Sequence, residues 1–234
     1  MKKVAIFVEG QTEQIFSDKF VRHIFGHTKV NVETLQFSGK EGARYIRVIR
    51  LTNITSSTKY SFYIYDCHGG GNNSTVKSDI IELFPSLVNK SFSYIIGIRD
   101  VFPLLDVNKL KTLMNINLPN NPVLPVKVIL AIREIEAWFL AEETHYPKIS
   151  KNLSFSTANA IAGIDVSKDN TEIIPHPSDT LKQIYIKGGT TYDKSMDKVQ
   201  RTVDALDYEN LYLAVRHRNN SLNELLTCLE GLVQ

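Results

Sequence analysis

The feature that most constrains the fold of this chain is a regular alternation of strand-like and helix-like segments. Short apolar or β-branched runs recur along roughly the first 140 residues, and most of them lead into a turn and an amphipathic segment. We expect strands at Val4–Val8, Val30–Phe37, Tyr60–Tyr65, Phe92–Ile98 and Val126–Ile132, and helices at Gln14–Phe25, Ala43–Leu51, Thr75–Val88 and Leu104–Met114. Repeated β-then-α units predict an α/β fold, with a Rossmann-like, mostly parallel central sheet between helices.

The texture of the sequence changes after Glu143. Residues 144–180 contain Pro147, Pro175 and Pro177 among Asn, Ser and Asp, and helical patterns return at Val199–Ala205 and Leu211–Leu232. We therefore expect an α/β core over residues 1–143, and a mainly helical C-terminal extension over 144–234 that packs on this core.

Composition limits the classes of protein to consider. At 234 residues and 43% hydrophobic, the chain is able to bury a sizeable core, and its net charge of +2 neither demands nor excludes a nucleic-acid partner. Cys67 and Cys228 lie far apart and match no metal-binding spacing, which favours a reduced compartment. The apolar run at the start is too short for a signal peptide, and no run approaches the roughly 20 apolar residues of a membrane span. We expect a soluble cytoplasmic protein.

Two carboxylates stand at the ends of expected strands. Glu9 follows Val4–Val8 directly, and Asp100 follows the strand that ends near Ile98. Because parallel strands end at one edge of a sheet, these acids are able to converge there, and a divalent cation would relieve their repulsion. Oxygen ligands of this kind favour Mg²⁺ or Mn²⁺. The alternative is structural, with Glu9 and Glu13 complementing a helix dipole and Asp100 capping a turn.

Other candidate residues carry weaker signals. His68 is a possible general acid or base, and Gly69–Gly71 a possible phosphate cradle, although the segment lacks the pattern of a nucleotide-binding P-loop. Arg44, Arg47 and Arg50 share one face of the expected helix at Ala43–Leu51, as phosphate contacts or as a solvated face.

Several motifs together resemble a Toprim domain. They are the segment VEGQTE after the first apolar strand, the glycines of HGGGNN (His68–Asn73) after another, and Asp100 at the end of IIGIRDVFP. Among Toprim proteins, the chain most resembles the OLD-type nucleases and a Toprim-like family named domain of unknown function 4276. The stretch REIEAWFLAE (Arg133–Glu142) is the most distinctive match to the latter, and HPSDTL (His176–Leu181) and YDKS (Tyr192–Ser195) also match it.

The resemblance implies a Toprim-like fold and a metal-dependent phosphodiesterase or nuclease. The implied catalytic residues are Glu9, Asp100, Glu136 and Lys194, and the implied ligands of Mg²⁺ or Mn²⁺ are Glu9, Glu13, Asp100 and Glu136. Toprim enzymes carry a second Asp two positions after the first, which this chain lacks. A helix through Glu134 and Glu136 would turn the two acids in different directions. We therefore expect Glu136 to supply the missing acid and Glu134 to be solvated.

The resemblance also implies partners. DNA or RNA is the expected substrate, and a separate ABC-type or AAA-type ATPase the expected partner, in defence against phage. The alternative is a non-catalytic module of the same fold, whose incomplete set of acids no longer binds metal tightly and which regulates such an ATPase.

Overall fold

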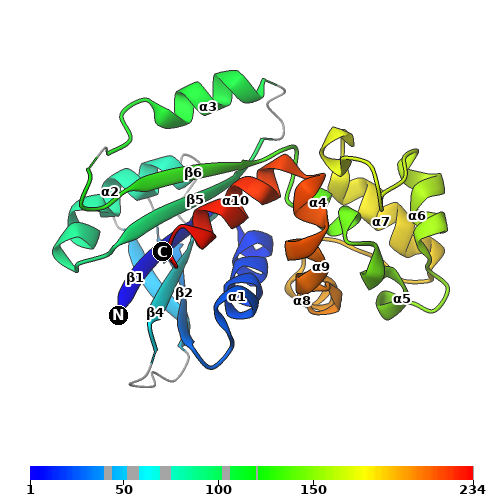
Figure 1. The fold of residues 1–234 in the computed structure, drawn as a ribbon, viewed down its shortest axis with the longest axis horizontal. Helices are drawn as coiled ribbons and strands as arrows, with labels where there is room; N and C mark the ends of the chain where they lie inside the picture. Colours follow the sequence, from blue (N-terminus) through cyan, green and yellow to red (C-terminus); the bar gives the residue numbers. More distant parts are fainter. Residues whose placement is uncertain (40–43, 52–57, 69–74, 102–105, 120, 234) are drawn as a thin grey trace. The chain divides into compact units, whose positions relative to one another are not determined.

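A computed structural model describes residues 1–39, 44–51, 58–68, 75–101, 106–119 and 121–233 (Figure 1). The strands are β1 (Lys2–Val8), β2 (Val30–Ser38), β3 (Tyr45–Leu51), β4 (Tyr60–Asp66), β5 (Tyr94–Asp100) and β6 (Val126–Ala131). The helices are α1 (Gln11–Phe25), α2 (Val76–Asn89), α3 (Val107–Asn115), α4 (Glu136–Ala141), α5 (Tyr146–Ile149), α6 (Phe155–Ala162), α7 (Pro177–Lys187), α8 (Met196–Ala205), α9 (Tyr208–Leu213) and α10 (Asn220–Glu230), with short 3-10 turns between several of them.

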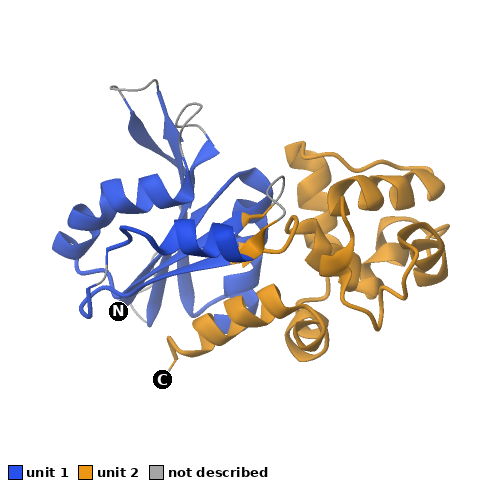
Figure 2. Cartoon of the chain, turned by 90° about the horizontal axis from the view of Figure 1, so that it is seen from above, with its two compact units in different colours: residues 1–99, 108–129 blue, residues 100–107, 130–234 orange. Residues whose placement is uncertain are grey.

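The chain forms two compact units, coloured separately in Figure 2. The first unit contains residues 1–99 and 108–129, and the second contains residues 100–107 and 130–234. The segment Arg133–Glu142 therefore belongs to the mainly helical second unit, whereas the sequence placed it at the end of an α/β core.

The six strands form one sheet in the order β3-β2-β4-β1-β5-β6. β1 runs parallel to both β4 and β5, β2 runs parallel to β4, and only the pairing of β2 with β3 is recorded as antiparallel among the described strands. Since Val8 lies opposite Ile98, β1 and β5 end at the same edge of the sheet. The predicted α/β class is confirmed, as are β4, β1 and β5 as parallel neighbours.

Helices α1 and α2 cover opposite faces of the sheet. Phe25 of α1 packs against Phe62 of β4 at a centroid distance of 5.0 Å. On the other face, Phe7 stacks on Tyr65 at 4.7 Å, in a buried cluster that includes Ile80 of α2. Neighbouring side chains along a strand point to opposite faces, so β1 and β4 are apolar on both sides and need a helix on each.

The helix predicted at Ala43–Leu51 is wrong, because β3 occupies Tyr45–Leu51. Its β-branched residues favour a strand, and its backbone pairs with β2. The spacing of the arginines imitated a helical face, but each arginine has a different partner in another element. Arg44 pairs with Asp79 and Glu82, Arg47 donates to Gln36, and Arg50 pairs with Asp18.

The short helix α4 is fully buried in the second unit, and neighbouring side chains satisfy its end. Thr171 donates to the carbonyl of Ala137, Tyr146 to that of Leu140, and Arg218 to that of Ala141. Trp138 is 0% exposed, and its indole N–H donates to Ser221 of α10 at 2.9 Å. These side chains hold the carbonyls that a short helix leaves without intrahelical partners, so the rest of the unit fixes α4 in place.

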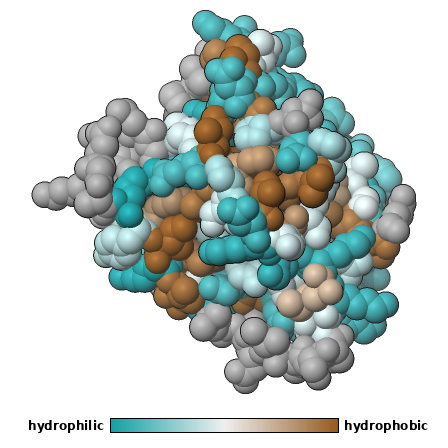
Figure 3. Space-filling model, turned by 90° about the vertical axis from the view of Figure 1, so that its left-hand side faces the viewer, coloured by the Kyte–Doolittle hydropathy of each residue, from teal (hydrophilic) through white to brown (hydrophobic). Residues whose placement is uncertain are grey.

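None of the helices placed in the structure is both long enough and apolar enough to cross a bilayer. On the side of the molecule drawn in Figure 3, hydrophilic side chains interrupt the groups of hydrophobic residues.

Candidate metal centre

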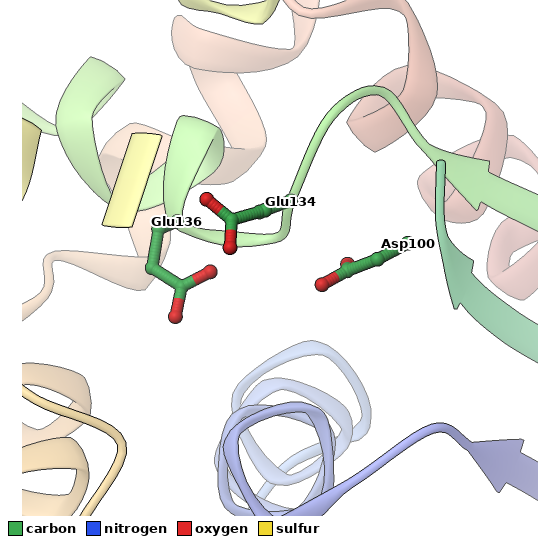
Figure 4. A group of neighbouring side chains, drawn as sticks. All are labelled: Asp100, Glu134 and Glu136. Carbon is green, nitrogen blue, oxygen red and sulfur yellow. The ribbon is translucent and has the colours of Figure 1, made fainter. Parts of the chain in front are cut away.

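Three carboxylates gather in the second unit. Asp100, Glu134 and Glu136 each offer an oxygen, and these oxygens lie within 4.8 Å of one another (Figure 4). At such separations, two carboxylates repel each other by about 3–4 kcal/mol at an effective dielectric near 20. We call this group the acidic cluster. Its members come from the end of β5, from the segment before α4 and from the first residue of α4.

Backbone hydrogen bonds join the end of β5 to the segment that carries the two glutamates. The amide of Val101 donates to the carbonyl of Ala131, and the amide of Ile135 donates to Oδ1 of Asp100 at 3.0 Å. The latter bond ties Oδ1 of Asp100 to Ile135, the residue that separates Glu134 from Glu136 in the sequence. These two bonds hold Asp100 beside the segment that carries Glu134 and Glu136.

Glu134 enters the acidic cluster because it precedes the helix. Arg133 has a φ of 68°, a left-handed conformation that ends the extended chain, and α4 begins only at Glu136. The carboxylate of Glu134 lies at the N-terminus of α7, where it accepts from the amide and hydroxyl of Ser178. Amides at a helix N-terminus favour an anion. The expectation that Glu134 is solvated is wrong, because it is 8% exposed and its divergence from Glu136 assumed a continuous helix.

Glu136 is the most deeply buried member of the acidic cluster, at 0% exposure. Its Oε1 accepts a hydrogen bond from the hydroxyl of Tyr192 at 2.9 Å, while its Oε2 has no hydrogen-bond partner among the described residues. Burial raises the pKa of Glu136, and the charge of Glu134 raises this pKa further, whereas Lys194 and Tyr192 oppose the shift. A buried carboxylate oxygen without a partner is costly and calls for an explanation such as a bound ion.

Lys194 supplies a positive charge beside the acidic cluster. Its Nζ lies 3.3 Å from Oε1 of Glu134, 3.6 Å from Oε1 of Glu136 and 4.0 Å from Oδ2 of Asp100. Its side chain is 48% exposed, against 10% for Glu134. One lysine against three ionised carboxylates leaves a net charge of −2.

The acidic cluster fits a divalent cation. Its donors are carboxylate oxygens only, a set that suits Mg²⁺, Mn²⁺ or Ca²⁺ better than softer metals. A doubly charged ion would balance the remaining charge and give Oε2 of Glu136 the partner that it lacks. The three carboxylates therefore form a place where a metal ion can be held, and their chemistry does not fix its identity.

The structure brings together Asp100, Glu136 and Lys194, three of the residues that the sequence singled out. Glu9 is exposed after β1, and Glu13 is buried in the first turn of α1, which begins at Gln11 after Gly10. Both belong to the first unit, and neither is in the acidic cluster. Their assignment as metal ligands stays a prediction.

The remaining candidates lie elsewhere or beyond description. His68 is exposed, and its backbone amide donates to Asp66. The glycines Gly69–Gly71 fall outside the described residues.

Sequence reasoning missed three parts of this site: Glu134, Ser178 and Tyr192. Each belongs to a segment whose pattern was noticed, namely REIEAWFLAE, HPSDTL and YDKS. In the structure these segments meet at one place, because Ser178 binds Glu134, Tyr192 binds Glu136 and Lys194 reaches both glutamates. The available signal was that each of these three short segments matches the same resembled family and carries polar residues.

Comparisons with known proteins add little to this description. No family model matches the chain, and no curated protein matches it significantly. The product of the gene lin2722 of Listeria innocua shares 14% identity at a TM-score of 0.26, over 42% of this chain and 38% of its own. A presumed cell surface hydrolase of Lactobacillus plantarum WCFS1 shares 13% at a TM-score of 0.28, over 70% and 64%. The matches span less than two thirds of either protein, and such low TM-scores bear on neither fold nor chemistry.

Proposed function

We propose that this protein is a metal-dependent phosphodiesterase, of the nuclease class, whose second unit holds Mg²⁺ or Mn²⁺ between Asp100, Glu134 and Glu136. The observation that carries the proposal is Oε2 of Glu136, which has no hydrogen-bond partner among the described residues, at 0% exposure in a group of three carboxylates within 4.8 Å. Carboxylates with a purely structural role would not be expected this close together, because their mutual repulsion and a buried oxygen without a hydrogen bond both cost stability. When bound, such an ion supplies polarisation of a phosphoryl oxygen and an activated water at neutral pH.

The protein's own residues divide the remaining work. Hydrolysis joins a water oxygen to phosphorus, breaks the ester P–O bond and returns a proton to the leaving oxygen. Lys194, half-exposed beside the acidic cluster, is placed to neutralise the negative charge that grows on the phosphoryl group. Ser178 and Tyr192 hold the two glutamates in position. Nucleic acid as the substrate, Glu9 as a further ligand or base, a separate ATPase partner and a role in phage defence rest on the sequence resemblance.

The decisive experiment joins metal binding to cleavage. Calorimetric titration with Mn²⁺ should show a site in the wild type, and Mn²⁺ should raise the melting temperature as ligand binding requires. Plasmid DNA, single-stranded DNA, RNA and bis(p-nitrophenyl) phosphate, each with Mn²⁺ or with EDTA, test the substrate. The variants Asp100→Asn and Glu136→Gln should lose both binding and cleavage. The matched control is Glu143→Gln, an acid just beyond α4 that pairs with Arg218.

One observation favours the non-catalytic alternative. Lys194 already contacts the acidic cluster, so part of the negative charge is balanced without a metal ion. If Lys194 is a fixed counter-ion, millimolar Mn²⁺ should leave the melting temperature unchanged and no phosphodiester should be cleaved. That result would contradict the enzymatic proposal and leave a structural or regulatory module.

A further inference from the structure

The position of Lys194 raises a conflict within the proposed site. Its ammonium group lies 3.3–4.0 Å from an oxygen of each member of the acidic cluster, so it stands where one cation contacts all three carboxylates. A metal ion that used the same oxygens would lie within a few ångströms of that ammonium. Two cations at such a distance repel strongly in a partly buried site. Lys194 and a metal ion therefore compete for the acidic cluster.

We propose that Lys194 and the divalent ion occupy the acidic cluster in turn, and that a phosphodiester anion draws Lys194 out, so that substrate and metal load the site together. This inference rests on the proposed function and names how the same site is regulated. Before loading, Lys194 acts as an internal cation that lowers the affinity for metal. After loading, it pairs with the substrate.

The contacts of the acidic cluster show which partner is able to move. Glu134 is fixed by the amide and hydroxyl of Ser178, Glu136 by the hydroxyl of Tyr192, and Asp100 by the amide of Ile135. These carboxylates are 12% exposed or less, whereas Lys194 is 48% exposed. When a metal ion enters, the side chain that reaches solvent is the one that leaves, and the anchored carboxylates stay.

The segment around Lys194 allows this exchange. Tyr192 and Lys194 contact the acidic cluster from one short segment before α8, while Asp193 between them binds Ser195 and Lys198 outside it. Tyr192 is 1% exposed and anchors the stretch, so movement of the lysine side chain does not require the backbone to leave. A lysine is a flexible point charge that pairs readily with phosphate oxygens.

Such competition couples metal and substrate. A ligand that pairs with Lys194 removes the repulsion that a metal ion meets, so each ligand should raise the affinity for the other by the same factor. The coupling depends on the positive charge at residue 194. It should disappear when that charge is removed and remain when arginine replaces lysine.

Calorimetric titration with Mn²⁺ tests the exchange without reference to catalysis. We compare wild type, Lys194→Met, Lys194→Arg and the control Lys198→Met. Lys198 lies four residues after Lys194, in the first turn of α8, and pairs with Asp193. Lys194→Met should bind Mn²⁺ more tightly than wild type by about five- to a hundredfold, the usual range of such couplings. Lys194→Arg and Lys198→Met should stay near the wild-type affinity. Lys194→Gln replaces the methionine variant if the latter does not fold.

A second arm adds a phosphorothioate oligonucleotide, an uncleaved polyanion that carries phosphodiester-like groups. It should tighten Mn²⁺ binding in wild type and leave the affinity of Lys194→Met unchanged. Equal or weaker Mn²⁺ binding by Lys194→Met than by wild type would overturn the exchange and leave the proposed metal site intact. Absence of Mn²⁺ binding in every variant would remove the metal site, and the exchange with it.

Discussion

The two ends of helix α4 carry glutamates that are equally buried but differ in how many hydrogen-bond donors surround them. Glu136 begins the helix, Glu142 follows its last residue, and both are 0% exposed. Glu142 accepts from the amide and hydroxyl of Thr144, from the side-chain amide of Asn210 and from the backbone amide of Asp207. Glu136 accepts from the hydroxyl of Tyr192 at Oε1, and its Oε2 has no hydrogen-bond partner among the described residues.

This difference separates a structural carboxylate from a candidate ligand. Neutral donors satisfy both oxygens of Glu142, and the bond from Asp207 ties it to the N-cap of α9. Glu172 has the same character, since it accepts from the amides of Asn220 and Ser221 at the start of α10. Burial alone therefore does not identify function in this unit. What marks Glu136 is incomplete satisfaction beside two like charges.

The largest expected effect comes from neutralising each end of α4. Glu142→Gln places an amide NH₂ where only acceptors fit, so it should lower the free energy of unfolding by about 3 kcal/mol or more, as loss of a hydrogen-bonded buried charge does. Glu136→Gln removes repulsion and should leave the apo stability equal or higher, while the response to Mn²⁺ disappears. Urea unfolding followed by fluorescence measures both, because Trp138, the sole tryptophan, lies within α4. Equal destabilisation by the two variants would remove the distinction between the ends.

The two ends should also respond oppositely to acid. Burial lowers the pKa of His145 to about 4, although the adjoining backbone carbonyl and charge of Glu142 oppose this shift. The unfolded chain then binds more protons than the folded one between about pH 6.5 and 4. Stability is complete above that window and should fall by about 3 kcal/mol as the pH drops through it. Glu136 has the opposite effect on stability. Because its pKa is raised in the folded protein, the folded chain takes up a proton at a higher pH than the unfolded chain, and this uptake adds stability as the pH falls.

Variants separate these contributions. Asparagine keeps a donor for the Glu142 carbonyl that the Nδ1–H of His145 contacts, and it does not titrate. His145→Asn should therefore flatten the loss of stability below pH 6.5, even if its stability at pH 8 is lower. Glu136→Gln should steepen that loss. The neighbours Tyr146, Tyr185 and Lys148 stay in place in both variants, so an unchanged slope in His145→Asn would assign the acid response to another group.

The sequence predicted the sheet well and the site in part, for physical reasons visible in particular residues. Runs such as Val4–Val8 are apolar on both faces, which specifies a central parallel strand regardless of the rest of the chain. The helix predicted where β3 lies was wrong because the arginines follow a helical spacing in the sequence, whereas their ion-pair partners lie in other elements. The prediction that Glu134 is solvated was wrong because Arg133, in a left-handed conformation, ends the extended chain, and the helix begins only after Glu134. Such long-range contacts and local backbone choices leave no periodic pattern.

A smaller effect distinguishes two buried tyrosine hydroxyls. Tyr192→Phe removes the hydroxyl that donates to Glu136, and Tyr185→Phe removes one that donates to Thr202 at 3.3 Å. The rings pack against each other at 6.0 Å, so both variants alter the same core. Each should change the free energy of unfolding by about 1 kcal/mol. Only Tyr192→Phe should weaken Mn²⁺ binding, by roughly tenfold for a bond of this strength, because Glu136 loses the contact that orients it. Equal Mn²⁺ affinities in the two variants would make Tyr192 a packing residue.

An effect on stability of similar size is predicted for the backbone turn that delivers Glu134. Arg133 and Ser91 are both non-glycine residues with positive φ, at 68° and 57°, but only Arg133 adjoins the acidic cluster. Valine is strained in this conformation, so Arg133→Val and Ser91→Val should each cost about 1–2 kcal/mol. Glycine accepts the conformation without strain, and Arg133→Gly should stay within about 0.5 kcal/mol of wild type. Because the amide of Ile135 holds Asp100 and Glu134 follows the turn, Arg133→Val should also weaken Mn²⁺ binding, whereas Ser91→Val should not. If calorimetry shows the same Mn²⁺ affinity in both valine variants, the turn at Arg133 is a local feature of the chain and does not position the carboxylates.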